Sequence, residues 1–204
     1  GFTESWGASW GDMNADNWPD MFNQGHRDFP RFYRNTGEGL FQDVAYEMDP
    51  GNWIAYPFDD KHGAAWADYN NDGYPDLYVS NLNGANRLYR NNRNGSFSDV
   101  AKRLNVQQPT TSFPTWFWDY NNDGILDIYV ASYDTGPGHV AADYLGLPHD
   151  APLDRLYQGD GHGGFHDVAK ERNLTRATQP MGSNFGDVDN DGFPDFYLGT
   201  GAPA

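Results

Sequence analysis

The 204-residue sequence contains no cysteine, which excludes disulfide bonds and thiolate metal sites. It also has no apolar run near the roughly 18 residues that a membrane span needs, so we predict no span. Positive charge is scarce: 13 Lys and Arg stand against 29 Asp and Glu, for a formal net charge of -16. Such a surface repels phosphates, so we expect cations rather than nucleic acid as partners.

Catalytic candidates are also few. The six histidines show no spacing typical of a zinc site or a catalytic triad. Paired carboxylates can hydrolyse glycosides, but the clustered aspartates are better explained as metal ligands. We therefore predict that the chain is not an enzyme.

The acidic residues instead follow a repeat. The pattern D-x-[DN]-x-D-[GN]-x-x-D begins at Asp12, Asp68, Asp119 and Asp187, at intervals of 56, 51 and 68 residues. We call these segments loop one (12–20), loop two (68–76), loop three (119–127) and loop four (187–195). A pattern that returns at this spacing is typical of repeat architectures.

The flanks of each loop favour strands. An aromatic residue lies two positions before each loop, and an apolar run rich in aromatic and β-branched residues, such as 77–79, follows it. The first three copies add an R-[FL]-Y segment and, eight residues after its Tyr, a Phe that opens a variant of F-x-D-V-A. Each full copy therefore predicts four antiparallel strands joined by hairpins, which is one blade of a β-propeller.

We accordingly predict an all-β chain in which 1–204 is a single propeller segment of three complete blades plus half a blade. The repeats are expected at about 6–46, 62–101, 114–169 and 182–204. The third contains an insertion at about 133–151, which is either a specificity loop or a tolerated surface insertion. Because the last copy ends after two strands, we expect either a longer parent propeller or self-assembly through open blade edges.

The loops have the chemistry of a calcium site. Oxygen side chains at positions one, three, five and nine can point at one centre if position six adopts a positive φ, as Gly73, Gly124 and Gly192 can without cost and Asn17 can tolerate. A ring of hard oxygens, completed by the backbone carbonyl of position seven, suits Ca²⁺ better than Zn²⁺ or Mg²⁺. The predicted ligands, for up to four Ca²⁺ ions, are Asp12, Asn14, Asp16, Trp18 and Asp20; Asp68, Asn70, Asp72, Tyr74 and Asp76; Asp119, Asn121, Asp123, Ile125 and Asp127; and Asp187, Asp189, Asp191, Phe193 and Asp195.

The loop pattern has two other interpretations, a helical EF-hand and a set of Asx turns. A helical EF-hand needs Glu at position twelve, where this chain has Asn23, Val79, Val130 and Leu198, so that motif is excluded. The aspartates and asparagines could instead serve only as formers of Asx turns, and this alternative stays open from the residues alone.

Segments 63–79, 87–92 and 185–199 carry a family resemblance. The copies resemble FG-GAP/VCBS-type repeats, as in the integrin α-subunit propeller, and the combination of segments is most similar to the cartilage acidic protein family. The resemblance implies a propeller, usually of seven blades, with extracellular placement and a role in binding or adhesion.

The leading functional hypothesis is therefore an extracellular, calcium-stabilised scaffold or adhesion module with a protein or glycan partner. An alternative is carbohydrate binding through the insertion and surface aromatics such as Trp53, Tyr56, Trp116 and Trp118, although blade cores use aromatics in the same way. A polysaccharide-cleaving enzyme is a third hypothesis, which rests on fold analogy alone.

Overall fold

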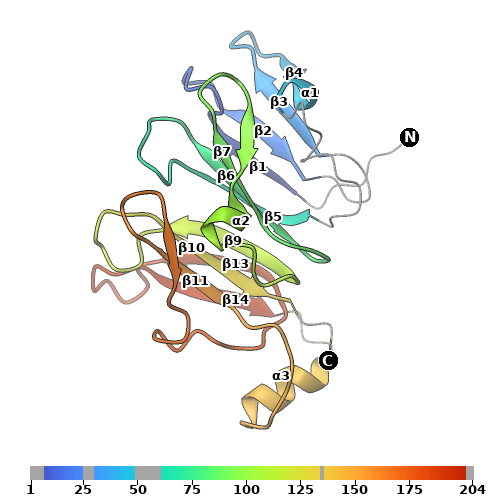
Figure 1. The fold of residues 1–204 in the computed structure, drawn as a ribbon, viewed down its shortest axis with the longest axis vertical. Helices are drawn as coiled ribbons and strands as arrows, with labels where there is room; N and C mark the ends of the chain where they lie inside the picture. Colours follow the sequence, from blue (N-terminus) through green and yellow to red (C-terminus); the bar gives the residue numbers. More distant parts are fainter. Residues whose placement is uncertain (1–6, 25–29, 49–60, 134–135, 201–204) are drawn as a thin grey trace.

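The chain folds as successive antiparallel sheets (Figure 1). The computed structural model describes residues 7–24, 30–48, 61–133 and 136–200. Each sheet is ordered as the chain runs, so that neighbouring strands are joined by hairpins. The first sheet contains β1 (Ala8–Gly11), β2 (Asp20–Asn23), β3 (Arg31–Asn35) and β4 (Phe41–Asp43); the second contains β5 (Lys61–Ala67), β6 (Asp76–Asn81), β7 (Arg87–Asn91) and β8 (Phe97–Asp99); the third contains β9 (Ser112–Trp118), β10 (Asp127–Ser132), β11 (Arg155–Gly159) and β12 (Phe165–Asp167); and the last contains β13 (Pro180–Gly186) and β14 (Asp195–Thr200).

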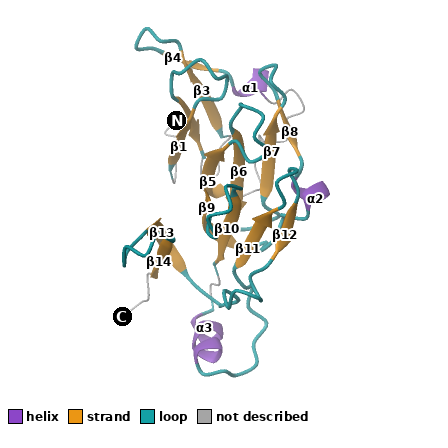
Figure 2. Cartoon of the chain, turned by 90° about the vertical axis from the view of Figure 1, so that its left-hand side faces the viewer, coloured by secondary structure: helices purple, strands orange, loops and turns teal. Residues whose placement is uncertain are grey.

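The prediction of four-stranded antiparallel blades is confirmed by three sheets, and the fourth copy supplies a two-stranded sheet. In Figure 2 the sheets follow one another along the length of the molecule, with the first sheet at the end opposite α3 (Pro137–Tyr144). The seven-bladed ring and the repeat boundaries stay predictions. No helix in the described ranges is long and apolar enough to cross a membrane.

Every loop joins the first two strands of its sheet in the same register. The residue before position one pairs with the aspartate at position nine: Gly11 with Asp20, Ala67 with Asp76, Trp118 with Asp127, and Gly186 with Asp195. Position nine is thus the first residue of the second strand in each sheet. The loops are hairpin connections, as the strand-flanked pattern predicts.

The core lies between neighbouring sheets. Successive strand residues point to opposite faces, so Leu77 packs with Phe22 and Phe32 of the first sheet, whereas Tyr78 packs with Ile128 of the third. All three partners and both β6 residues have fully buried side chains. Burying one such side chain stabilises the fold by about 2 kcal/mol. The packing of neighbouring sheets through these side chains therefore fixes the position of each loop relative to the next.

Within the described residues, three helical segments interrupt the all-β pattern. Short helices α1 (Ala45–Met48) and α2 (Ala101–Leu104) follow the last strands of the first two sheets. The helix α3 lies inside the predicted insertion, where the sequence indicated only a long loop. The insertion therefore has secondary structure of its own.

Candidate metal centres

The aspartate at position one organises each loop by accepting two backbone hydrogen bonds. In loop two, the amide of Asp72 donates to one carboxylate oxygen of Asp68 at 2.9 Å, and the amide of Gly73 donates to the other at 2.7 Å. The same pair of bonds recurs in the other three loops at 2.7 to 3.0 Å. Because two amides hold one carboxylate, the chain curls around it as the calcium hypothesis requires.

Two positions in each loop have left-handed backbone. Position six has φ of +70° at Asn17 and +88° at Gly73, and the glycines of loops three and four are similar at +81° and +91°. This confirms the conformation expected there. Position four is also left-handed, with φ of +59° at Ala15 and +55° at Asn71. The repeated Asn at position four was a signal for this second turn that the sequence reasoning missed.

The aspartate at position nine is built into the blade. In the first three loops it is fully buried. One oxygen of Asp20 accepts a hydrogen bond from the Met13 amide at 2.8 Å, and the other accepts one from the amide of Asn35, the last residue of β3, at 2.8 Å. Asp127 repeats this arrangement with two amides, the second from β11 at 2.9 Å. Position nine therefore ties the loop to the third strand as well as facing the other loop oxygens.

Burial of these carboxylates changes their acidity. It raises the pKa of Asp76 to about 7, an effect opposed by the amide of Asn91 and reinforced by the charges of Asp72 and Asp68. Burial likewise raises the pKa of Asp127 to about 6 and raises that of Asp20. An anion buried beside other anions is the setting that a bound divalent cation relieves.

Loop two provides an independent test of whether calcium fits. The Oδ1 atom of Asn70 is buried and has no hydrogen-bond partner among the described residues, while the buried Oδ2 atom of Asp76 has only the Tyr69 amide near it and makes no bond of standard geometry. Buried polar atoms are nearly always paired in folded proteins, so an unpaired oxygen at position three beside an under-paired carboxylate at position nine fits a cation. These hard oxygens match the ligands of Ca²⁺.

Loop four brings three carboxylates together. One oxygen from each of Asp187, Asp189 and Asp195 lies within 4.8 Å of the others, at positions one, three and nine. It is the one such acidic group in the described part of the chain, since position three is Asn in the other loops. The position-five carboxylate of Asp191 is not part of this group, and it accepts the amide of Phe193 at 2.8 Å.

The predicted ligands at positions five and three also form hydrogen bonds within their own loops. Position-five aspartates accept the amide of position seven in every loop, at 2.8 to 3.1 Å. Asn14 and Asn121 donate to the position-five carboxylates of their own loops, at 2.8 Å each. The carbonyls of Trp18, Tyr74 and their counterparts as ligands stay a prediction.

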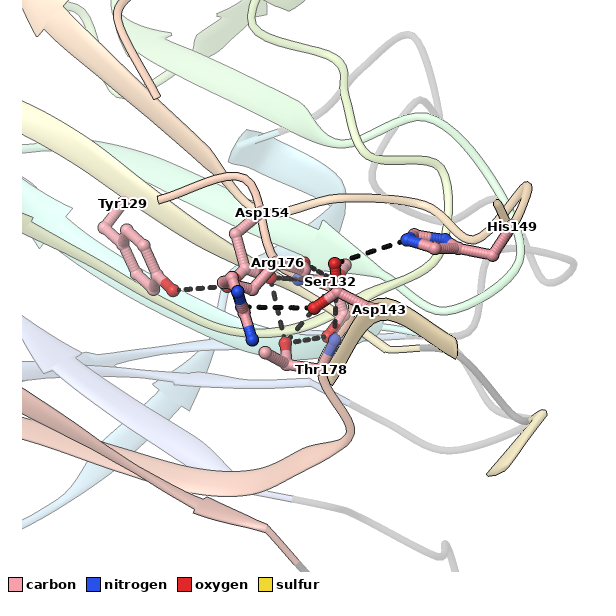
Figure 3. Close-up of polar contacts among 7 residues, drawn as sticks. All are labelled: Tyr129, Ser132, Asp143, His149, Asp154, Arg176 and Thr178. Atoms are coloured by element: carbon pink, nitrogen blue, oxygen red, sulfur yellow. Dashed lines mark hydrogen bonds and ion pairs between the residues drawn. The ribbon is translucent and has the colours of Figure 1, made fainter. Parts of the chain in front are cut away.

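The insertion is held by a separate polar cluster (Figure 3). Asp143 on α3 is 3.3 Å from His149 and 3.1 Å from Arg176, so it joins the insertion to the segment before β13. Nearby, the buried Asp154 accepts hydrogen bonds from Tyr129, from the amide and hydroxyl of Ser132, and from Thr178. Burial raises the pKa of Asp154, against these donors. The cluster is a structural brace.

Two of the aromatic residues proposed for sugar stacking, Trp116 and Trp118, belong to the core. Trp116 and Trp118 are 7% and 5% exposed and pack against Tyr129 and Phe196. They are not surface residues. Trp53 and Tyr56 lie outside the described residues.

Two glycine patterns that resemble catalytic motifs have unsuitable settings. Residues 7–11 have the G-x-S-x-G spacing, but Ser9 lies within strand β1 rather than on a strand-to-helix turn. Residues 159–164 have the G-x-G-x-x-G spacing, but they connect β11 to another strand, β12, and open no helix. Neither segment has the geometry of its motif.

Comparison with known proteins agrees with this repeated architecture. The model of the FG-GAP-like repeat matches residues 12–79, 68–130 and 119–198, each match running from one loop through the next. Human cartilage acidic protein 1 is 26% identical over 211 residues, covering 98% of this chain and 29% of the human protein. The Xenopus tropicalis protein of the same name is 27% identical over 180 residues, covering 84% of this chain and 25% of that protein. The chain thus spans less than a third of these relatives, and on the strength of the repeat matches it belongs to the FG-GAP-like repeat family.

Proposed function

We propose that this chain is a calcium-stabilised propeller segment that serves as an extracellular scaffold or adhesion module. Its ions are structural: each loop holds its ligands at the start of a blade, and in loops one to three the aspartate at position nine is hydrogen-bonded to the third strand of its sheet. The observation that supports the proposal is the buried, unpaired Oδ1 atom of Asn70 in loop two, which lies in the same loop as the buried carboxylate of Asp76. Asx turns alone would leave the Asn70 oxygen unsatisfied.

The extracellular part of the proposal rests on affinity. All-oxygen loops of extracellular modules bind calcium at about 10⁻⁴ to 10⁻³ M. At a free concentration ten times the dissociation constant, each site stabilises the fold by about 1.4 kcal/mol. Four sites of this kind have a large effect outside cells, where calcium is abundant, and almost none at the low concentrations inside them.

The test is thermal and urea unfolding with millimolar calcium and after verified removal of metal by chelator. We expect the melting temperature to rise with calcium concentration and to respond much less to magnesium, which dehydrates reluctantly and prefers a stricter octahedral site. If removal of the metal left the stability unchanged, the proposal would be wrong.

A matched pair of variants assigns the effect to the loops. Asp72→Asn removes one negative charge from loop two, and Glu38→Gln removes one from an exposed hairpin outside all four loops. Only Asp72→Asn should reduce the calcium response. Equal reductions would indicate general screening of a protein of charge -16 rather than specific sites.

A further inference from the structure

Three of the chain's 13 basic residues gather in one place. Arg90, Arg93 and Arg103 line a cavity of about 480 Å³, together with His162. Asp72 is the one acidic residue in the lining. The protein as a whole has a net charge of -16, whereas the cationic residues in this lining outnumber the acidic one.

The cavity lies at the junction of the second and third sheets. Loop two provides one wall, strand β7 and the turn that follows it provide Arg90 and Arg93, and α2 provides Arg103. The turn between β11 and β12 closes it with His162 and Gly163. A Cβ atom at Gly163 would lie 3.6 Å from the Cβ of Asn70, so this turn packs directly against loop two. The walls therefore come from parts of the fold that the core holds in place.

Comparison of the blades shows that the arginine at this site lacks its usual neighbour. In the first sheet, Arg34 pairs across the strands with Gln42 and donates to it at 2.9 Å. At the corresponding place in the second sheet, Arg90 faces Ser98, whose hydroxyl donates instead to Asn92.

The corresponding position in the third sheet has a different residue, and its side chain has a hydrogen-bond partner. Gln158 stands where the other sheets have arginine, and it accepts a hydrogen bond from Tyr120, whose hydroxyl also accepts one from Arg172. By contrast, neither Arg90 nor Arg103 makes a hydrogen bond or ion pair within the described part of the chain. Two guanidinium groups thus face the cavity without a protein acceptor.

We propose that this cavity binds an oxyanion, namely the sulfate, phosphate or carboxylate group of a small polar molecule. Guanidinium groups present planar, paired donors that match such anions and bind them by charge-assisted hydrogen bonds. Arg90 and Arg103 are the principal ligands. The volume leaves room for the molecule that carries the charged group.

A second step rests on the proposed calcium function. Arg93 pairs with the Oδ2 atom of Asp72 at 3.0 Å, and Asp72 is a predicted calcium ligand. An ion in loop two competes for that carboxylate and releases Arg93 toward the anion. Calcium should therefore strengthen anion binding, and by linkage the anion should strengthen calcium binding by the same factor.

The experiment uses the whole chain and four sugars that differ in one group: glucose 6-sulfate, glucose 6-phosphate, glucuronate and glucose. Binding is measured by calorimetry and by ligand-observed NMR at low ionic strength, first with chelator. We expect at least one charged sugar to bind at millimolar concentration or below while glucose does not, and the arms identify the preferred anion. Absence of binding by all three charged sugars would overturn the proposal.

Variants locate the site. Arg90→Ala and Arg103→Ala should each weaken binding about tenfold, whereas Arg34→Ala, at the matching position of the first sheet, should leave it unchanged. Arg103 is exposed, so its loss should not affect folding, and melting curves check this for all three. Equal affinities in the wild type and both cavity variants would also overturn the proposal.

The calcium arm separates the two claims. Repeating the titration with saturating calcium should raise anion affinity about fivefold. No rise, in a protein that calcium stabilises, would refute the coupling through Arg93 and leave the anion site standing. A protein that calcium does not stabilise refutes the proposed function, and the titration with chelator still decides the anion site.

Discussion

Position four of the loops offers the sharpest test of their geometry. Ala15 in loop one has φ of +59°, whereas loops two to four have Asn at this place with φ of +55° to +63°. For an ordinary L-residue the left-handed conformation costs about 1–2 kcal/mol, and Asn adopts it several-fold more readily than most other residues. Loop one therefore carries strain that the other loops avoid.

The substitution Ala15→Asn should stabilise the protein, and its mirror image Asn71→Ala should destabilise it. Asn71 is exposed and makes no side-chain hydrogen bond within the described ranges, so its replacement changes little besides backbone preference. We expect each change to be about 0.5–1 kcal/mol. For a protein of this length, each kcal/mol of stability shifts the melting temperature by roughly 2–4 °C.

The assay is thermal unfolding followed by circular dichroism, in calcium and in chelator, because backbone strain should be felt in both. Gly39→Ala is the control for a left-handed position outside the loops: φ is +77° and nothing lies within 4 Å of an added Cβ. It should destabilise the protein like Asn71→Ala. If Ala15→Asn fails to stabilise while both alanine variants destabilise, the conformation assigned to Ala15 is wrong.

Three further predictions concern buried or ligating carboxylates. Asp72→Ala should lower calcium affinity more than Asp16→Ala, since loop two has glycine at position six; calorimetry showing the reverse order would contradict this ranking. Asp154→Ala should destabilise the fold by about 3 kcal/mol, because it strands buried donors, and Asp154→Asn by clearly less; urea unfolding that gives equal losses would show that those donors do not matter. In chelator, the folded pKa values of about 7 for Asp76 and about 6 for Asp127 exceed the unfolded value of about 3.9, so the folded state binds more protons. Their contribution to stability is complete below about pH 4 and is lost as pH rises through 6 to 7, so stability that increased from pH 5 to pH 8 without metal would refute it.

Much of the architecture could be predicted from local signals. The loop pattern, the aromatic two residues before it and the apolar run after it all lie within about twenty residues, and together they define a hairpin. Glycine at position six indicates a left-handed turn for a steric reason that needs no tertiary context. The sheets and the order of their strands could therefore be predicted from these local features.

The missing parts depend on contacts between distant residues. The second donor to Asp20 comes from Asn35, and the second donor to Asp127 comes from Gly159, beyond the insertion. The arginine cavity forms only when the turn at Gly163 packs on loop two. Sequence spacing predicts the aspartates as oxygen ligands but cannot show which of them also hydrogen-bond to the strands of the blade.

Position nine explains why the metal should matter for the whole blade rather than for the loop alone. Its carboxylate begins the second strand, accepts an amide from the loop, and accepts another from the end of the third strand, as at Asp20. In loops one to three this carboxylate is buried, so without a cation its charge opposes the packing that the two amides favour. On the proposed function, a divalent ion would remove that opposition and leave both hydrogen bonds in place. Since the second strand also forms the contact between neighbouring sheets, occupancy of one loop should stabilise the blade and its junction with the next.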